Sequence, residues 1–344
     1  MRAERSAASR NATSSLSPVL ITRTPLRISI AGGGTDLPSY YRQRSALVVA
    51  AGINRYCYVA INRTFVNDYF LKYSELERVD AVDDVRHPII REALRMLDIE
   101  PGIEIASMAD IPSGTGLGSS GTFTVGLLRA LHALQRRHVS ARQLAEEACR
   151  IEIDLLGRSV GKQDQYIAAF GGLTCFQFHP DESVEVSPLA IPEQTLLELE
   201  ERLLLFFTGY SRSASSILDD QNKRTTEGDK AMLDSLEFTA ELGHRIKATL
   251  ESGDCPGFAK LMNEHWEYKR HRSPGMSNSS IDTWYRAALD NGAIGGKLVG
   301  AGAGGFLLCY TEDPAMLRPA MAAEGLAETR FRFDFDGSVV LARG

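Results

Sequence analysis

A glycine-rich segment followed by two serines carries the strongest chemical signal in the sequence. Pro112-Ser-Gly-Thr-Gly-Leu-Gly-Ser-Ser120 runs directly into an apolar pattern typical of a helix. Glycines let the backbone turn tightly, and the free amides at a helix start favour a phosphate. The two hydroxyls could bind a phosphate oxygen and a metal ion. The segment is not a Walker A loop, because no lysine follows its last glycine. A serine-capped turn is the alternative.

Two carboxylates follow at a spacing that would let them share a site. Glu152 lies in a predicted helix that stops near Gly157, and Asp164 follows in Gly161-Lys-Gln-Asp-Gln165. A turn that contains glycine could bring both side chains together. One carboxylate could then hold Mg²⁺ while the other accepts a proton from a hydroxyl. Without such convergence they are a solvated helix charge and a turn residue.

Two further glycine-rich segments stand near the two ends of the chain. Arg27 lies in a predicted strand that ends in Gly32-Gly-Gly-Thr-Asp36. Asp36 could accept hydrogen bonds from sugar hydroxyls, or it could cap a turn. Gly300-Ala-Gly-Ala-Gly-Gly305 permits close backbone approach, either to a ligand or to a neighbouring element.

Three other patterns give weaker signals. Ser159-Val-Gly-Lys162 matches the Ser-x-x-Lys of serine acyl enzymes, but the companion motifs are absent. Lys269-Arg-His-Arg272 is basic, yet in a chain of net charge −6 it favours a solvated helix end or an anion contact over nucleic acid. His265 and His271 are too poorly spaced to place two metal ligands on one helix face.

The composition is that of a globular protein. The 344 residues are 44% hydrophobic and 24% charged, and a chain of this length can bury a large core without disulfides or metals. The longest apolar run, residues 46–53, is too short to span a membrane. Five scattered cysteines without a Cys-x-x-Cys pattern predict reduced thiols and a cytoplasmic location. Residues 1–18 predict a disordered tail.

Hydrophobic periodicity predicts strands and helices that alternate irregularly, which favours an α+β fold over a doubly wound parallel sheet. A composition shift at 188–193 predicts a domain boundary there. The predicted helices include residues 88–97, 228–251, 257–270 and 280–291, and one that begins with a capping box at Ser140-Ala-Arg-Gln143. The predicted strands include residues 26–30, 46–53, 56–62, 70–73, 103–107, 173–178, 203–208, 306–310 and, last, 331–335.

In this order the motifs resemble those of the GHMP kinase superfamily, over nearly the whole chain from about Thr24. Three segments match: Pro25-Leu-Arg-Ile-Ser-Ile-Ala-Gly-Gly-Gly-Thr-Asp36, residues 112–120, and Lys297-Leu-Val-Gly-Ala-Gly-Ala-Gly-Gly305. Within the superfamily, Gln163-Asp-Gln-Tyr166 and Phe170-Gly-Gly172 look like the D-glycero-α-D-manno-heptose 7-phosphate kinases. Galactokinases usually carry Gly-Glu-His where this chain has three glycines, which argues against galactose.

The resemblance implies a two-domain α+β architecture with the active site in the cleft between the domains. Residues 19–190 would form the domain with the phosphate loop, and residues 191–344 a ferredoxin-like domain. Asp164 would be the catalytic base with Arg27 near it, and Glu152 with Ser120 would hold Mg²⁺. The ATP-binding residues would be Pro112, Gly114, Gly116, Leu117, Gly118, Ser119 and Ser120, with Ser119 as the alternative metal ligand. The sugar-binding residues would be Asp36, Gly33, Gly34, Thr35, Gly302, Ala303, Gly304 and Lys162.

The implied reaction is ATP-dependent phosphorylation of the anomeric hydroxyl of D-glycero-D-manno-heptose 7-phosphate, which supplies nucleotide-heptose for surface polysaccharide. No nucleic-acid or membrane partner is expected, and a homodimer is compatible with the sequence. The alternatives are a kinase for fucose, mannose or galactose, and a non-catalytic sugar or nucleotide sensor. A phosphorylated substrate requires a cationic pocket, and the candidates for it are Lys162, Lys269, Arg270, Arg272 and Lys297.

Overall fold

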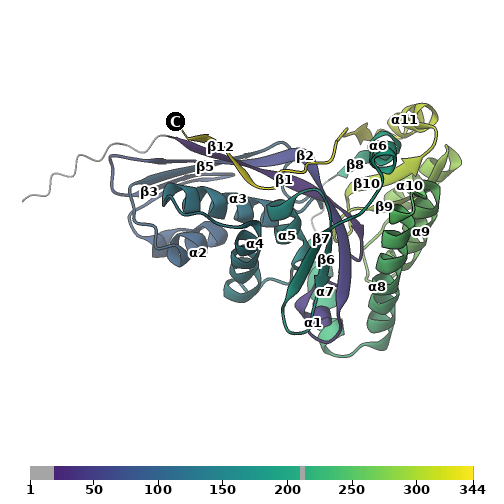
Figure 1. Ribbon diagram of the computed structural model, residues 1–344, viewed down its shortest axis with the longest axis horizontal. Coiled ribbons are helices and arrows are strands. Elements are labelled where there is room, and N and C mark those ends of the chain that lie inside the picture. Colours follow the sequence, from purple (N-terminus) through teal and green to yellow (C-terminus); the bar gives the residue numbers. More distant parts are fainter. Residues whose placement is uncertain (1–18, 210–213, 344) are drawn as a thin grey trace, which may run out of the picture.

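The computed structural model describes residues 19–209 and 214–343, so the predicted tail at 1–18 lies outside the described residues. Helices and two sheets build the molecule, a mixed eight-stranded sheet and an antiparallel four-stranded one (Figure 1). The α+β class predicted from the sequence is therefore confirmed. The division into domains at residue 190 stays a prediction.

An eight-stranded sheet forms the first layer. Its central strand is β2, which pairs through its first half with β6 and through its second half with β5. All neighbours are antiparallel except β3 and β5, which run parallel. The strands are β1 (Leu20–Ala31), β2 (Ala46–Arg63), β3 (Tyr69–Lys72), β4 (Leu76–Val79), β5 (Ile103–Ala109), β6 (Leu173–Phe178), β7 (Val184–Pro188) and β12 (Val339–Arg343).

The first half of β2 is buried on both faces, which explains its continuous apolar run. Val48 and Ala50 belong to the core beneath the helices that follow β1 and β2, whereas Leu47 and Val49 belong to a second core shared with the C-terminal part of the chain. A strand covered on both faces does not show the alternation of polar and apolar residues that a half-exposed strand shows. The two cores of the molecule therefore pack against opposite faces of β2.

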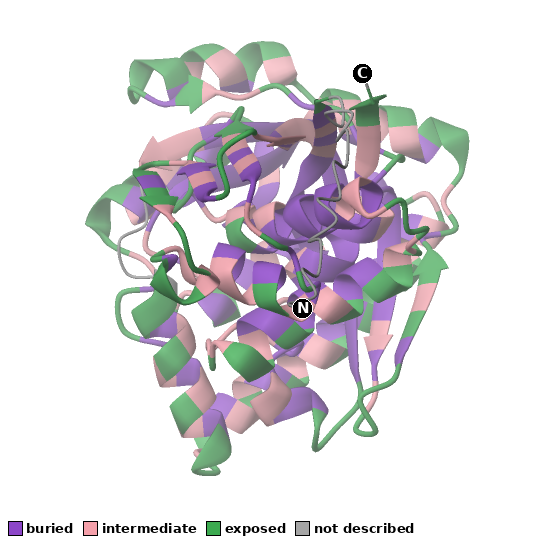
Figure 2. Cartoon of the chain, turned by 90° about the vertical axis from the view of Figure 1, so that its left-hand side faces the viewer, coloured by how far each residue is buried: buried purple, intermediate pink, exposed green. Residues whose placement is uncertain are grey.

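Helices from the first half of the chain cover one face of the large sheet, and all except η1 contribute buried residues beneath them (Figures 1 and 2). The buried stripes contain mostly alanine, leucine and isoleucine, as amphipathic helices require. These elements are α1 (Pro38–Tyr41), η1 (Val82–Asp84), α2 (Pro88–Met96), α3 (Ser119–Leu134), α4 (Ala141–Cys149), the π-helical segment η2 (Arg150–Leu155) and α5 (Gln163–Phe170).

A smaller four-stranded sheet, in the order β11-β8-β10-β9, forms the other end of the molecule. Long helices pack against it and against the large sheet, and Trp266 of α9 is fully buried among them. The elements are α6 (Glu193–Arg202), β8 (Leu203–Gly209), α7 (Ala214–Thr226), α8 (Lys230–Glu251), α9 (Cys255–Lys269), α10 (Ser279–Asp290), β9 (Ala293–Leu298), β10 (Gly305–Thr311), α11 (Pro314–Ala323) and β11 (Ala327–Glu328).

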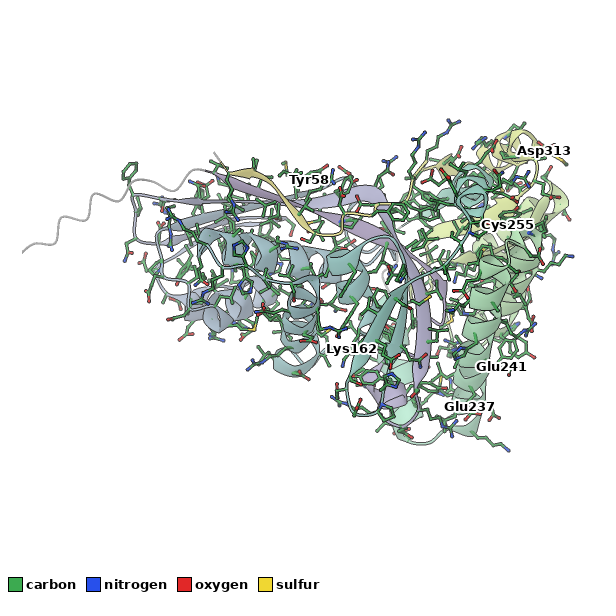
Figure 3. The ribbon with its side chains drawn as sticks, in the orientation of Figure 1. Tyr58, Lys162, Glu237, Glu241, Cys255 and Asp313 are labelled. Atoms are coloured by element: carbon green, nitrogen blue, oxygen red, sulfur yellow. The ribbon has the colours of Figure 1, made fainter. Side chains whose placement is uncertain are left out.

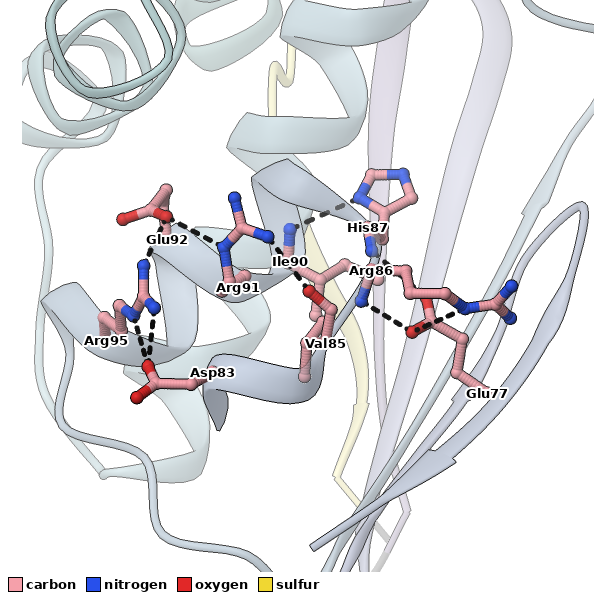
Figure 4. Close-up of polar contacts among 9 residues, drawn as sticks. All are labelled: Glu77, Asp83, Val85, Arg86, His87, Ile90, Arg91, Glu92 and Arg95. Atoms are coloured by element: carbon pink, nitrogen blue, oxygen red, sulfur yellow. Dashed lines mark hydrogen bonds and ion pairs between the residues drawn. The ribbon is translucent and has the colours of Figure 1, made fainter. Parts of the chain in front are cut away.

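The start of α2 is held by a carboxylate from the preceding hairpin (Figure 4). Glu77 accepts hydrogen bonds from the backbone amides of Arg86 (2.7 Å) and His87 (3.1 Å), and His87 Nδ1 accepts one from the amide of Ile90 (3.3 Å). These bonds satisfy amides that a helix start leaves free. They also fix His87 beside the loop that leads into α3, where its ring stacks at a tilt on Phe123.

Three local predictions differ from the structure. Residues 331–335 form no strand: Phe333 makes a single bridge to Ile53, and Phe335 is exposed, so the last strand is β12 instead. The capping box at α4 is half formed. Ser140 Oγ accepts from the amide of Gln143, but the Gln143 side chain donates to Glu147 rather than back to the cap. α7 was not predicted.

Within the described ranges, no helix is both long enough and apolar enough to cross a membrane.

Candidate active site

The loop between β5 and α3 has the backbone geometry of an anion site. Gly114, Gly116 and Gly118 have φ angles of +79°, +80° and +79°, which residues with side chains rarely adopt. Gly118 is the N-cap of α3 and supplies no side-chain cap, so the first turn keeps its amides free for an anion. Pro112 and Leu117 act through their carbonyls, which accept bonds from Thr115 Oγ1 (3.1 Å) and the Arg27 amide (3.1 Å).

Arg27 and Asp164 form an ion pair at the foot of this loop. Arg27 Nε donates to Asp164 Oδ1 at 2.7 Å, and Arg27 Nη1 donates to the carbonyl of Gly116 at 2.6 Å. The arginine is buried, whereas the carboxylate side chain is 31% exposed. A Cβ on Gly121 would lie 2.8 Å from the Asp164 Cβ, so that glycine lets α5 approach α3. The pair therefore presents an oriented, accessible carboxylate, which a general base needs.

Glu152 is fully buried in η2 and contacts Ser120 at the start of α3. Burial raises the pKa of this carboxyl, while hydrogen bonds from Ser120 and Gln165 act in the opposite direction. π-helical turns such as η2 occur often at functional sites. Four side chains donate to its oxygens: Ser120 Oγ, Thr124 Oγ1 (3.2 Å), Gln165 Nε2 (3.0 Å) and Arg158 Nη1 (3.3 Å). The structure thus brings Glu152 and Ser120 into contact.

Asp36 is buried at the end of the β1 glycines. Its carboxylate accepts from the amides of Gly34 (2.9 Å) and Gln163 (3.0 Å), and burial, reinforced by the charge of Asp164, raises its pKa. A Cβ on Gly161 would collide with this carboxylate. Thr35 was predicted to bind the sugar, but its hydroxyl stabilises the turn, because it donates to the carbonyl of Gly32 (2.8 Å).

The segment from Gly300 to Gly305 packs backbone to backbone against the phosphate loop. A Cβ on Gly300 would lie 2.7 Å from the Gly116 Cα, and one on Gly305 would lie 2.3 Å from the Thr115 carbonyl. Among the described residues, Gly302, Ala303 and Gly304 line neither cavity at this site. Ala303 donates instead to the carbonyl of Met276 (3.1 Å). The close packing predicted as one alternative is what Gly300, Gly302 and Gly305 show.

Two cavities meet at the ion pair between Arg27 and Asp164. The first lies along the phosphate loop, and the second lies between the Asp36 turn and the C-terminal part of the chain. Leu218 of α7 and Gly300 line both as well. The first is also lined by His87, Ser113, Gly114, Gly116, Gly118, Ser119, Ser120 and Arg158, and the second by Ser29, Gly33, Gly34, Asp36, Gln163, Gln221, His265, Lys269, Arg272 and Lys297.

The second cavity holds three buried cations. Lys269 Nζ donates to the carbonyls of Leu298 (3.2 Å) and Gly300, and Lys297 Nζ donates to that of Ile30 (2.7 Å). Burial, and then the charges of Arg272 and Arg27, lowers the pKa of Lys269 to about 7. Burial also lowers the pKa of Arg272 to about 10 and that of Lys297 well below its usual value. Such crowding of cations favours an anionic ligand.

Two of the five candidate cations lie elsewhere. Lys162 Nζ binds Glu182 at 2.8 Å and sits 4.6 Å above the ring centre of Tyr41, away from both cavities (Figure 3). Arg270 pairs with Asp282 at 3.0 Å. The turn that follows α9 explains this: the Arg272 amide donates to the Lys269 carbonyl (3.0 Å), and both side chains line the second cavity, whereas Arg270 turns away to Asp282.

The pairing of Lys162 with Glu182 predicts a pH-dependent contribution to stability. Burial alone would raise the pKa of Glu182, but hydrogen bonds from Lys162 and Arg42 outweigh it and lower that pKa to about 2. A carboxyl whose folded-state pKa lies below its unfolded value of about 4.5 stabilises the fold above that value and loses the effect as the pH falls through 2.

We expect wild type to exceed Glu182→Gln in unfolding free energy at pH 7, and this difference to vanish between about pH 4.5 and 2. Urea titrations at several pH values measure it. Glu185→Gln, on the same hairpin and 79% exposed, is the matched control. A difference that does not change with pH would contradict the assignment.

Several residues that line the site were not predicted from the sequence. Gln163 Nε2 and His265 Nε2 are buried without a hydrogen-bond partner among the described residues, and both line the second cavity. Gln163 belongs to the motif Gln163-Asp-Gln-Tyr166, but no role in the site was predicted for it. His265 precedes Lys269 by one helical turn, and that spacing was the available signal. Leu218 and Gln221 lie in α7, a helix that was not predicted, and nothing in the sequence pointed to either residue.

The residues around Glu152 fit a magnesium ion held jointly with a nucleotide. No group of three His, Cys, Asp or Glu side chains in residues 19–209 and 214–343 could hold a metal alone. Mg²⁺, however, commonly uses one or two carboxylates together with substrate phosphates and water. Ser119 Oγ is buried and unpartnered among the described residues, which leaves a hydroxyl for such a ligand. Glu152 and Ser120 would hold the ion.

Glu152→Gln is expected to raise the Mg²⁺ concentration for half-maximal activity by about tenfold, because an amide oxygen is a weaker ligand for a hard cation. The measurement is a Mg²⁺ titration at saturating nucleotide. Glu147→Gln provides the control, since Glu147 lies on α4 and pairs with His132 away from the cavities. An unchanged Mg²⁺ titration would remove Glu152 from the metal site.

The fold and site together define a phosphotransferase, in which a glycine loop faces an oriented carboxylate. Residues 85–172 match the family model described as the GHMP kinases N terminal domain, and residues 246–325 match that described as GHMP kinases C terminal. The chain is 31% identical to the D-glycero-α-D-manno-heptose 7-phosphate kinase of Campylobacter jejuni, over 85% of this chain and 89% of that relative. The chain belongs to the GHMP kinase family.

Two further comparisons agree with this family. The chain is 25% identical to the galactokinase of Pyrococcus furiosus, over 85% of this chain and 89% of that protein. The crystal structure of a D-glycero-D-manno-heptose 1-phosphate kinase from Bacteroides thetaiotaomicron superposes with a TM-score of 0.77 at 25% identity, over 94% of this chain and 99% of that one. The two heptose kinases are named for different phosphate positions, so their names agree on a heptose phosphate only.

Proposed function

We propose that the chain transfers the γ-phosphoryl group of ATP to the anomeric hydroxyl of D-glycero-D-manno-heptose 7-phosphate. The products are ADP and the 1,7-bisphosphate, a precursor of nucleotide-heptose for surface polysaccharide. The new bond joins the sugar O1 to the γ-phosphorus, and the bond from that phosphorus to the β–γ bridging oxygen breaks. The hydroxyl proton passes to Asp164.

In this proposal the first cavity holds the nucleotide. Loop amides and the first turn of α3 would bind the phosphates, and a bound Mg²⁺ would neutralise charge on them. Arg27 holds Asp164 at the junction of the cavities, where the acceptor hydroxyl must lie. Asp36, Gln163 and His265 would bind sugar hydroxyls in the second cavity. Phosphoryl transfer depends chiefly on such positioning and charge stabilisation.

The observation that carries the choice of substrate is the buried group of Lys269, Arg272 and Lys297 in the second cavity. None of these three buried side chains forms an ion pair with a carboxylate among the described residues, so a neutral sugar would leave them without an anionic partner, which is costly for buried charges. A substrate that already bears a phosphate would compensate them. The heptose phosphates in the names of the two relatives are consistent with this requirement.

ADP release with Mg-ATP tests the proposal across a panel of acceptors: the heptose 7-phosphate, the unphosphorylated heptose, mannose, galactose, fucose, mevalonate and homoserine. We expect turnover of the 7-phosphate far above the rest. Preference for a neutral sugar would favour the second candidate, a free-sugar kinase like the galactokinase relative. ATP binding without turnover of any acceptor would favour a sensor.

The low pKa of Lys269 predicts how substrate affinity depends on pH. Burial, Arg272 and Arg27 lower this pKa to about 7, so above pH 7 the free enzyme loses the cation. We expect the KM for the sugar phosphate to rise by up to about tenfold per pH unit above 7, while the KM for ATP stays nearly constant. Steady-state kinetics from pH 6.5 to 8.5 measure both constants. A flat profile for the sugar phosphate would contradict a role for charged Lys269.

A further inference from the structure

Arg158 occupies the position between the two residues that would hold the metal. Its Nη1 donates to Ser120 Oγ at 3.0 Å and lies 3.3 Å from Glu152 Oε2. The Arg158 side chain is 35% exposed, whereas the Glu152 side chain is 1% exposed. The same guanidinium lines the first cavity, beside the phosphate loop. A single cation of the chain therefore engages both candidate ligands.

This contact conflicts with metal binding at the same atoms. Ser120 Oγ donates to Glu152 and accepts from Arg158, so its proton and a lone pair are both in use. A divalent cation requires lone pairs of these oxygens and is repelled by a guanidinium at such short range. Arg158 must leave the pair when the metal enters.

The surroundings leave Arg158 one favourable destination. Its backbone stays anchored, because its amide donates to the Glu152 carbonyl at 3.0 Å. The residue before it, Gly157, has φ +62°, and a Cβ added there would meet no atom within 4 Å, so the turn that carries Arg158 is uncrowded at that position. The cavity beyond is bounded by glycine amides and serine hydroxyls that suit phosphate oxygens. Arginine binds such oxygens through a planar fork of donors.

We propose that Arg158 is a displaceable counter-ion: it neutralises Glu152 while the site is empty and turns onto the nucleotide phosphates when the divalent cation binds. The inference rests on the proposed kinase function but not on the identity of the sugar. It assigns Arg158 two opposed effects. In the empty protein Arg158 weakens metal binding, and in the loaded protein it strengthens nucleotide binding.

The first test measures Mn²⁺ binding to the nucleotide-free protein by electron paramagnetic resonance. Arg158→Gln removes the charge, and we expect it to tighten Mn²⁺ binding by about tenfold, since a competing cation is lost. Arg158→Lys keeps the charge and should bind Mn²⁺ close to wild type. Arg318→Gln is the matched control, because Arg318 is also 35% exposed and pairs with Glu328 (2.9 Å) far from this site.

The second test measures ADP binding at saturating Mg²⁺ by calorimetry, because Arg158 turns onto the phosphates only when the divalent cation is bound. We expect Arg158→Gln to weaken ADP binding by about tenfold, with partial rescue in Arg158→Lys and no change in Arg318→Gln. Unchanged or weaker Mn²⁺ binding in Arg158→Gln would overturn the proposal, because a structural ion pair predicts that result. Unchanged ADP binding would overturn it as well. If the wild-type protein binds no ADP at all, the kinase function itself fails, which separates the two conclusions.

Discussion

Asp164→Asn is expected to lower kcat by at least about 100-fold and to leave the KM for ATP within about twofold. Asparagine has the shape of aspartate and its amide oxygen can still accept the bond from Arg27 Nε. It cannot take the proton of the acceptor hydroxyl. Loss of an interaction used only in the transition state lowers kcat and kcat/KM together. The KM for ATP should change little, because the loop amides of the first cavity would bind the nucleotide.

Steady-state kinetics with both substrates varied would measure this effect. Asp154→Asn serves as the control, because Asp154 is exposed on the same stretch of chain as Glu152 but outside both cavities. A near-wild-type kcat in Asp164→Asn would exclude Asp164 as the base. Transfer would then depend on positioning and charge alone, which a loose transition state permits.

Arg272→Gln should raise the KM for the sugar phosphate by about 10- to 100-fold, the range expected when a charge-assisted bond to a phosphate is lost. Arg272 is buried in the second cavity, where Ser235 Oγ accepts from its Nε (3.1 Å) and Thr239 Oγ1 from its Nη2. These bonds aim the remaining edge of the guanidinium toward Gly34, beside the cavity. The KM for ATP should not change.

Arg270→Gln is the matched control for Arg272→Gln. It removes an arginine two positions away that pairs with Asp282 outside the cavity, so both KM values should stay near wild type. Thermal unfolding of both variants separates lost binding from lost stability, because Arg272 also bonds to α8. If Arg272→Gln raises the KM for ATP and spares that for the sugar phosphate, the phosphate subsite lies elsewhere.

The parts of the site that the sequence predicted are those encoded in short contiguous motifs. The phosphate loop depends on three left-handed glycines within five residues, a constraint that is local to the backbone. Glu152 and Asp164 are separated by one short connection, so a single turn suffices to make them converge. Their contacts with Ser120 and Arg27 were reasonable expectations from motif order.

The sequence named Lys269, Arg272 and Lys297 among five candidate cations, but local patterns could not tell which of the five converge on one cavity. Lys269 lies on α9 and Lys297 on β9, and each completes its hydrogen bonds on a backbone carbonyl of another segment. Only the packing of β1 against the C-terminal part brings Ile30 to Lys297. Lys162 shows the opposite case, in which closeness in sequence suggested a site residue that the fold places elsewhere. It adjoins the proposed base in sequence, but the start of α5 turns it toward Glu182.

The prediction of secondary structure failed at segments whose conformation depends on tertiary contacts. Phe331 and Phe333 are buried as strand residues would be, yet only one bridge to β2 forms, and Phe335 is left 59% exposed. α7 is rich in Ser, Asp, Asn and Thr, which have low helix propensity, and packing near the Asp36 turn stabilises it: Gln221 donates to the Gly34 carbonyl (2.8 Å). Propensity alone could not anticipate either outcome.

The pairing of β12 with β1 has a consequence for biosynthesis. Leu20 is opposite Arg343, so β1 is synthesised more than 300 residues before the strand that completes its ladder. Until residue 339 has been made, β1 presents an open edge, which invites association with other chains. A nascent chain of this protein therefore needs protection along that edge until β12 has been made, and premature termination upstream of Val339 would leave the edge permanently unpaired.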